Sequence, residues 1–232
     1  MSVSESTQPS PFLSPSSGGT ELYLIRHADA LPDAAEVVEG GYNEQALSPL
    51  GRKQAEALAA GMRGLTLTAV YSSPIPRAVQ TAQPLAELQG LEVRLDDGLR
   101  EVALGPMDVG LGPDATPAQR AAAIRDGLHE LARMVVTTGV WTGVPGTESS
   151  QALRGRMTET VDRIAAGHPG QRIALVSHGG SINAYIAAFL GIERDYFFPA
   201  ANTSVSVVRW HGARRLLMGL NDISHLRQAG LM

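Results

Sequence analysis

The sequence predicts a three-layer α/β/α domain in which helices cover both faces of a mostly parallel central sheet. Two observations lead to this prediction. Short apolar runs of strand length alternate, along most of the chain, with longer segments whose apolar residues recur at helical spacing. Ser-Pro pairs open two of these longer segments, as is typical of helices that begin with a capping serine and a proline in the first turn.

Strands and helices alternate strictly in the first part of the chain. The first expected strand runs directly into Arg26, and the two helices begin at Ser48-Pro49 and Ser73-Pro74. We expect, in order, a strand at 21–25, a helix at 48–64, a strand at 68–71, a helix at 73–88 and a strand at 91–95.

The alternation is interrupted between Leu104 and Gly146, where Gly-Pro pairs accompany a single expected helix at 117–136. We interpret this stretch as an inserted helical cap that covers the ligand site and influences the choice of ligand. Past the insertion the alternation returns. We expect a helix at 148–166, a strand at 173–177, a helix at 181–190 and two closing strands at 204–210 and 214–219.

The first twenty residues are rich in Ser, Pro and Gly and nearly free of apolar side chains, so they predict a disordered tail. They lack the basic start and apolar run of a secretory signal, and no later run approaches the length that spans a bilayer. We therefore expect a cytoplasmic protein with a tail at 1–20 and one domain at 21–232, which contains the cap insertion at about 104–146.

Composition narrows the chemistry by exclusion. The 232 residues carry a formal net charge of −4 and no basic cluster, which argues against nucleic acid or a membrane surface as a partner. The chain has no cysteine, which excludes disulfides, thiolate nucleophiles and cysteine zinc sites. Apolar residues make up 44%, which suffices for a packed globular core.

Chemically active residues follow several expected strands at the point where each strand ends. Arg26 and His27 come directly after the first strand, and Arg77 lies shortly after the second. Glu101 follows the third strand, and His178 follows the strand that comes after the insertion. Ligands of parallel sheets bind beyond the carboxyl ends of the strands. The chain can therefore bring two histidines, two arginines and a carboxylate to one edge of the sheet.

These residue types in one place favour a phosphoryl site with a histidine nucleophile. The guanidinium groups of Arg26 and Arg77 offer forked donors that match phosphoryl oxygens and stay charged at any working pH. A neutral imidazole has a free lone pair, and the two cations disfavour the charged form of His27, so we expect its pKa to be lowered. The helix start at Gly179 and Gly180 adds amide groups that favour an anion.

A metal site made of His27, Asp29 and His178 is conceivable from the ligand types alone. The two arginines beside these residues would repel a cation, so we reject a metal and expect no cofactor. The remaining histidines share no spacing and are predicted to be surface residues: His129, His168, His211 and His225.

Five stretches carry a further signal: LIRHADA at 24–30, LSPLGRKQA at 47–55, VYSSPIPRAVQTA at 70–82, LREVALG at 99–105 and VSHGGSI at 176–182. Together they resemble the histidine phosphatase superfamily, the phosphoglycerate-mutase-like proteins. An Arg-His pair alone is a weak motif, but its combination with the arginine before a Gln-Thr-Ala helix and with the later Ser-His-Gly is specific. Their order fits the family from about residue 21 to the end, without most of the insertion.

The resemblance implies a phosphoglycerate-mutase-like fold and a role for each matching residue. His27 would be the nucleophile that becomes phosphohistidine, and Glu101 the proton donor to the leaving oxygen. Arg26, Arg77 and His178 would bind the phosphoryl oxygens. These roles describe a metal-independent phosphomonoester hydrolase that acts on a small phosphorylated substrate.

The chain departs from the family's commonest motif directly after the nucleophile, because Ala28 and Ala30 replace a glycine and a hydroxyl residue. This form resembles one branch of small phosphatases. Asp29 faces either the substrate or its own loop, and the sequence leaves both open. Residues at the rim of the pocket are expected at Asp29, Glu148, Ser149, Asn202 and Thr203.

Two other functions stay open, a cofactor-dependent phosphoglycerate mutase and a phosphate- or phosphoprotein-binding relative without turnover. Mutases of the family have an arginine a few residues after the second His-Gly, where this chain has Asn183, and extra basic residues for a second acidic group. The insertion is only modestly basic, so hydrolysis is favoured. The presence of all five core residues argues against a pure binding module. A homodimer through an exposed sheet edge is also allowed.

Overall fold

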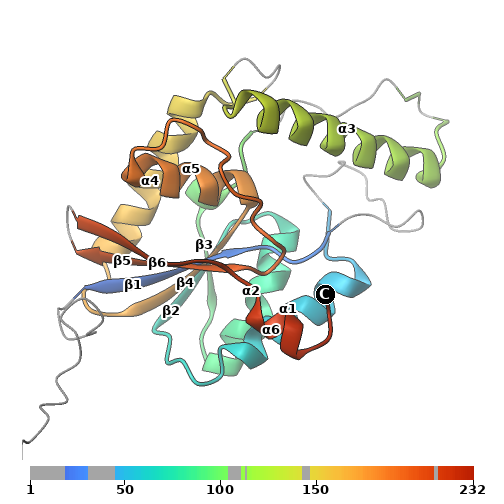
Figure 1. Ribbon diagram of the computed structural model, residues 1–232. Helices are drawn as coiled ribbons and strands as arrows, with labels where there is room; N and C mark the ends of the chain where they lie inside the picture. Colours follow the sequence, from blue (N-terminus) through green and yellow to red (C-terminus); the bar gives the residue numbers. More distant parts are fainter. Residues whose placement is uncertain (1–18, 31–44, 104–110, 113, 143–146, 212–213) are drawn as a thin grey trace, which may run out of the picture.

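A computed structural model describes residues 19–30, 45–103, 111–112, 114–142, 147–211 and 214–232 of the chain. Within these ranges, helices flank a central six-stranded sheet (Figure 1). The strands are β1 (Thr20–Arg26), β2 (Ala69–Ser72), β3 (Val93–Leu95), β4 (Arg172–Ser177), β5 (Val205–His211) and β6 (Arg214–Asp222). The helices are α1 (Pro49–Gly61), α2 (Pro76–Gln89), α3 (Pro117–Thr138), α4 (Ser150–Ala166), α5 (Gly179–Leu190) and α6 (Ser224–Gln228), and a 3₁₀ turn covers Asp97–Leu99.

The sheet has the order β3-β2-β4-β1-β5-β6. The first four of these strands run parallel to their neighbours, whereas β5 is antiparallel to both β1 and β6. Only two residues separate β5 from β6 in the sequence, and so short a connection joins antiparallel strands but not parallel ones. The predicted mostly parallel sheet is confirmed. β3 and β6 form its edges, and a homodimer through either edge stays a prediction.

Alternation along β4 explains why both faces of the sheet are covered. Ile173 and Leu175 are buried in one apolar cluster with side chains of α4 and α5. Ala174 and Val176 are buried in a second cluster with side chains of α1 and α2. Successive residues of a strand point to opposite faces, so a strand that is apolar throughout needs a helical layer on each side. The predicted three-layer architecture is confirmed.

Most expected strands and helices lie within a few residues of their predicted positions, but the start of α2 differs. The sequence predicts a capping Ser73, whereas α2 begins at Pro76 and no side chain caps it. Pro76 satisfies the same preference for proline in the first turn. The hydroxyl of Ser73 lies beside His178 instead. The short helix α6 and the 3₁₀ turn are not predicted.

The helix expected within the insertion is present as α3, and Thr116 and Gln119 form a capping box at its start. Figure 1 shows α3 apart from the helices that pack on the sheet. Residues 104–110 and 143–146 lie outside the described ranges, so the extent of the predicted cap at 104–146 stays a prediction. Residues 1–18 of the predicted tail also lie outside them, whereas Thr20 is buried and begins β1.

A membrane span requires a helix that is both long and apolar. None of the described helices is long and apolar enough to cross a bilayer.

Candidate active site

Two neighbouring parallel strands deliver the two histidines of the site. β1 ends at Arg26 and β4 ends at Ser177, and these two residues are paired in register. His27 and His178 follow at the carboxyl ends of the two strands, and their ring centroids are 5.0 Å apart. The structure therefore brings together two side chains that are far apart in the sequence.

Arg77 reaches His27 from the first turn of α2. Arg77 is only 1% exposed, and its Nε donates to Nε2 of His27 over 3.2 Å. Nδ1 of the same ring lies 2.7 Å from the carbonyl oxygen of Ala28. Because a carbonyl oxygen can only accept, Nδ1 carries the proton and Nε2 keeps its lone pair. This neutral tautomer is the form that a histidine nucleophile needs.

Burial lowers the pKa of His27 well below its ordinary value of 6.5, and the charges of Arg77 and Arg26 lower it further. The hydrogen bond to the Ala28 carbonyl acts in the opposite direction but is outweighed. Burial and then the charge of Arg77 lower the pKa of His178 in the same way. Both rings are therefore neutral at neutral pH, as the sequence predicts for His27.

Three buried nitrogen atoms around the site have no hydrogen-bond partner among the described residues. They are Nε of Arg26, Nδ1 of His178 and Nε1 of Trp141. Nε2 of His178 lies 2.9 Å from the hydroxyl of Ser73, so Nδ1 is the ring atom left for a ligand. An unpartnered buried polar group costs about 1–3 kcal/mol and is rare in proteins. A ligand rich in acceptor oxygens, such as a phosphoryl group, fits this set.

Acid should destabilise the fold over a pH range that the buried histidines set. Burial also lowers the pKa of His225, against the charge of Asp222. The unfolded chain protonates these rings near pH 6.5, whereas the folded chain keeps them neutral to lower pH. The free energy of unfolding should therefore fall as the pH drops below about 6.5, by about 1 kcal/mol per pH unit for each histidine. Urea unfolding between about pH 7 and pH 5 measures this slope.

Glu148 does not contribute in this range. Burial raises the pKa of Glu148, but its hydrogen bonds with Arg156 and Ala103 and the charge of Arg156 together outweigh burial and lower the pKa below 4.5, so this group acts only in stronger acid. The variant His27→Gln removes one titrating ring and should give a shallower slope than the parent protein. Equal slopes would show that His27 binds protons equally in the folded and unfolded states.

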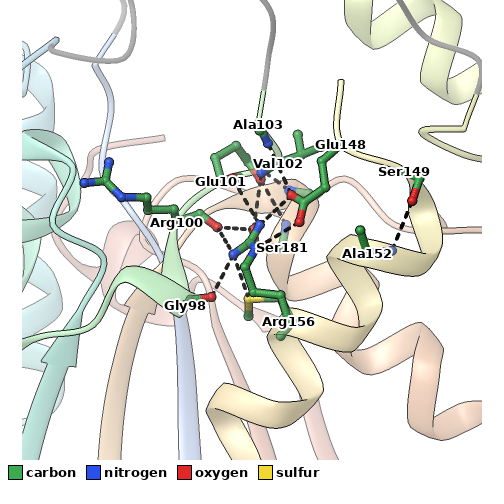
Figure 2. Close-up of polar contacts among 12 residues, drawn as sticks. Gly98, Arg100, Glu101, Val102, Ala103, Glu148, Ser149, Ala152, Arg156 and Ser181 are labelled. Atoms are coloured by element: carbon green, nitrogen blue, oxygen red, sulfur yellow. Dashed lines mark hydrogen bonds and ion pairs between the residues drawn. The ribbon is translucent and has the colours of Figure 1, made fainter. Parts of the chain in front are cut away.

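Glu101 lies against the start of α5, on the segment that follows the 3₁₀ turn (Figure 2). Its carboxylate accepts hydrogen bonds from the amides of Gly180 at 3.3 Å and Ser181 at 3.0 Å, and from the Ser181 hydroxyl at 3.2 Å. A Cβ atom on Gly180 would stand 2.7 Å from Oε1 of Glu101, so the approach requires a glycine. The sequence offers the Gly180 amide to a phosphoryl group, but Glu101 occupies it.

A cavity of about 280 Å³ opens beside these residues. Arg26, His27, Glu101 and Gly179 line it. Apolar side chains also line it, from Trp141 and from α3 through Leu128, Leu131, Ala132 and Val135. The pocket therefore combines His27, Arg26 and Glu101 with an apolar part of its lining.

Two of the predicted rim residues line this cavity. Asp29 lies on it, and its carboxylate also accepts a hydrogen bond from Ser48, which caps α1. Asp29 therefore combines the two arrangements that the sequence leaves open, because it contacts both the pocket and its own loop. Asn202 lines the cavity and donates from Nδ2 to the carbonyl oxygen of His27 over 3.1 Å.

The other three predicted rim residues are not among the described residues that line the cavity. Glu148 forms an ion pair with Arg156 at 2.7 Å. Ser149 caps α4. Thr203 is buried, adopts a positive φ of 55° and has its hydroxyl 2.9 Å from Nε2 of His225. Each of these polar side chains serves the local structure.

Sequence reasoning missed several residues around the site. Thr81, which lies within the quoted Gln-Thr-Ala motif, accepts a hydrogen bond from the amide of Ala28 at 2.9 Å and holds the loop after His27. Trp141 and Tyr196 line the cavity, but no sequence signal marks them.

The predicted surface histidines divide into two groups. His211 is exposed, and His129 is exposed but lines the cavity. The prediction is wrong for His225, which is buried, and His168 is half-buried beside the hydroxyl of Tyr71. Among the described residues, no group of three or more His, Asp or Glu side chains is placed to hold a metal ion.

The sequences of known proteins match this chain over nearly its whole length. A family model described as "Histidine phosphatase superfamily (branch 1)" matches residues 22–223. "Phosphoglycerate mutase-like protein 4" of Arabidopsis thaliana is 32% identical over 216 residues, which cover 91% of this chain and 89% of that protein. "Putative phosphoserine phosphatase 2" of Hydrogenobacter thermophilus is 24% identical over 209 residues, which cover 89% of this chain and 98% of that protein.

Solved structures share the fold. A mycobacterial glucosyl-3-phosphoglycerate phosphatase superposes with a TM-score of 0.68 at 28% identity, over 88% of this chain and 100% of that chain. YhfR of Bacillus stearothermophilus superposes with a TM-score of 0.70 at 23% identity, over 89% of this chain and 99% of that chain. With its fold, its paired histidines and a family match over residues 22–223, the chain belongs to the histidine phosphatase superfamily, branch 1.

Proposed function

We propose that the chain is a phosphomonoester hydrolase in which Nε2 of His27 accepts the phosphoryl group. The observation that carries the proposal is the hydrogen-bond pattern of this ring. The carbonyl of Ala28 holds the proton on Nδ1, so Nε2 keeps its lone pair, which accepts a hydrogen bond from Nε of Arg77. Membership of the superfamily and the phosphatase names of the relatives from Hydrogenobacter thermophilus and mycobacteria support it.

In the first step, the lone pair of Nε2 attacks phosphorus, an N–P bond forms and the P–O bond to the leaving group breaks. The donors of Arg77 and Arg26, together with Nδ1 of His178, would stabilise the charge on the three phosphoryl oxygens. The carboxyl group of Glu101 gives a proton to the leaving oxygen. The step ends with phosphohistidine, a carboxylate and the released alcohol.

In the second step, water attacks phosphorus and the N–P bond breaks. The Glu101 carboxylate takes a proton from this water, so it returns to its starting form as phosphate leaves. The lone pair of His27 is restored, and the site is ready for another substrate. One hydrolysis is thus divided into two transfers that use the same donors.

We further propose that these steps need no metal ion. In phosphoryl transfer the main requirement is fixed positive charge around the equatorial oxygens. Arg26 and Arg77 supply this charge here. Burial is the main cause of the lowered pKa of His27, and the charges of both guanidinium groups lower it further. A divalent cation beside them would be repelled by the same charges.

The pocket supports a substrate whose organic part is apolar. Apolar side chains of α3 and Trp141 form part of its lining. Within the described lining, Arg26 is the sole lysine or arginine. Burial of apolar surface contributes about 25 cal/mol per Å² to binding of such a group. We therefore propose small apolar or aromatic phosphomonoesters as the preferred substrates.

A mutase is the second candidate, because the relative from Arabidopsis thaliana is named phosphoglycerate mutase-like. Asn183, which replaces the arginine that mutases would have, argues against it. Its Nδ2 donates to the carbonyls of Gly179 and Phe198, and its Oδ1 accepts from the amides of Phe197 and Phe198. This buried side chain has used its hydrogen-bonding capacity on the backbone and has none left for a substrate.

The test is phosphate release from 1-naphthyl phosphate and from 3-phosphoglycerate, with EDTA present. We expect release from both and a higher kcat/KM for the naphthyl ester. Interconversion of phosphoglycerates that depends on a bisphosphate primer, without phosphate release, would make the protein a mutase. Binding of vanadate without turnover of either ester would make it a binding module. Loss of activity in EDTA that a divalent cation restores would contradict the metal-independent route.

A further inference from the structure

We propose that Arg156 is a positioning residue for the catalytic acid, and that it acts by fixing the backbone from which Glu101 projects. The proposal rests on the proposed function, because it takes Glu101 as the proton donor. Arg156 lies on α4 and does not line the cavity in the described part of the chain. It would thus influence the reaction without touching the substrate.

The segment that carries Glu101 lacks regular secondary structure of its own. It follows the 3₁₀ turn at Asp97–Leu99, and residues 100–103 belong to no strand or helix. The backbone of such a segment has no ladder partners, so its carbonyl groups need other hydrogen-bond donors. Four consecutive carbonyls, those of residues 98–101, accept hydrogen bonds from side chains.

Arg156 donates hydrogen bonds to three of these four carbonyls. Nη1 donates to Gly98 at 2.7 Å and to Arg100 at 2.9 Å. Nη2 donates to the carbonyl of Glu101 itself at 3.3 Å. Figure 2 shows the guanidinium group surrounded by this segment. The hydroxyl of Ser177 donates to the remaining carbonyl, that of Leu99, at 2.8 Å.

Glu148 completes the arrangement from the other side. Nε and Nη2 of Arg156 donate to its two carboxylate oxygens at 3.0 and 2.7 Å. The same carboxylate accepts from the amide of Ala103 at 3.3 Å, and the amide of Glu148 donates to the carbonyl of Ala103 at 3.0 Å. A guanidinium group has five N–H donors, and each of those of Arg156 has an oxygen acceptor here. The pair therefore joins α4 to both ends of the Glu101 segment.

This geometry requires an arginine. A lysine at position 156 would keep the positive charge but could not point donors at three carbonyls and a carboxylate from one plane. The side chain of Arg156 is 26% exposed and that of Glu148 is 14% exposed, so solvent replaces few of the lost bonds. The Glu101 backbone should then shift in Arg156→Lys, and a displacement of about 1 Å can slow an oriented reaction about 10²-fold.

The test compares two esters that share an aromatic ring but differ in the leaving group. Benzyl phosphate needs a proton on its leaving oxygen, whereas 4-nitrophenyl phosphate departs without one. We expect Arg156→Lys to lower kcat/KM for benzyl phosphate by about 10²-fold and to leave that of the nitrophenyl ester nearly unchanged. A loss of equal size on both esters would overturn the proposal, because a general structural defect does not distinguish leaving groups.

A double-mutant cycle shows whether Arg156 acts through Glu101. In a Glu101→Gln background the acid is already absent, so Arg156→Lys should cause no further loss on benzyl phosphate. The same fold-loss in both backgrounds would overturn the proposal. If Glu101→Gln itself does not distinguish the two esters, the proposed role of Glu101 fails instead, and the two failures are thereby separable.

Arg172→Lys is the matched control. Arg172 also forms an ion pair with a glutamate, Glu21, at 2.9 Å, but it lies where β4 begins, at the opposite end of that strand from His178. We expect this variant to behave like the parent protein on both esters. Thermal unfolding of each variant verifies that it is folded at the assay temperature. If Arg156→Lys does not fold, Glu148→Gln removes part of the same arrangement and should give the same preference for the nitrophenyl ester.

Discussion

Replacing His27 by asparagine is expected to abolish hydrolysis of every phosphomonoester while leaving the fold intact. The loss in kcat should be on the order of 10⁶, the size measured when an enzyme loses its covalent nucleophile. Asparagine keeps an N–H donor for the carbonyl of Ala28, with which Nδ1 of His27 interacts at 2.7 Å. It offers no ring nitrogen to phosphorus. The variant therefore separates the chemistry of Nε2 from the packing of the side chain.

Chemical trapping gives the same prediction a direct measurement. Rapid denaturation in base of the parent protein with a radiolabelled ester should give a label on residue 27 that is stable in base and labile in acid, as expected of an N–P bond. His27→Asn should take up no label. His211→Asn, which changes an exposed histidine on β5, should label normally. Hydrolysis by His27→Asn at the parent rate would mean that water attacks the substrate directly.

Replacing Glu101 by glutamine should slow the reaction by an amount that depends on the leaving group. Glutamine keeps an oxygen that can accept from the Ser181 amide, which donates to Glu101 at 3.0 Å, but it cannot release a proton. General acid catalysis contributes about 10²- to 10⁴-fold, so kcat/KM for benzyl phosphate should fall by this factor. The value for 4-nitrophenyl phosphate should change little.

The parameter kcat/KM is chosen because it reports the first transfer, in which the leaving group departs. Glu159→Gln, an exposed position on α4, serves as the control and should match the parent on both esters. A uniform loss on both esters would indicate that Glu101 orients the substrate and that another group supplies the proton.

The fold and the centre of the site could be predicted from the sequence because their signals are local. His27 and His178 each directly follow an apolar strand, and parallel strands end at one edge. Arg77 lies in the first turn of the helix after β2, which places it at the same edge. In each case the sequence neighbours of the residue determine where it lies.

The hydrogen bonds that hold the Glu101 segment could not be predicted, because the residues that form them are far apart in the sequence. Arg156 is a polar residue on an amphipathic helix, and such a residue is usually solvated. Its carbonyl partners at 98, 100 and 101 lie more than fifty positions away and carry no side-chain signature. For the same reason the sequence predicts Glu148 at the rim of the pocket, since it does not reveal the pairing of Glu148 with Arg156. Ser73 resembles a helix cap in the sequence. The helix begins at Pro76, three residues later, and the sequence does not distinguish these two possible starts.

The carbonyl of Ala28 that fixes the proton on Nδ1 of His27 belongs to the main chain. Every amino acid that could replace Ala28 brings a carbonyl of its own, so no point mutation can delete this acceptor. Most enzymes that orient a histidine with a carboxylate can lose that partner in a single codon change. In this chain the backbone itself fixes the proton on Nδ1 of His27. A mutation can instead change Thr81, whose hydroxyl accepts a hydrogen bond from the amide of Ala28.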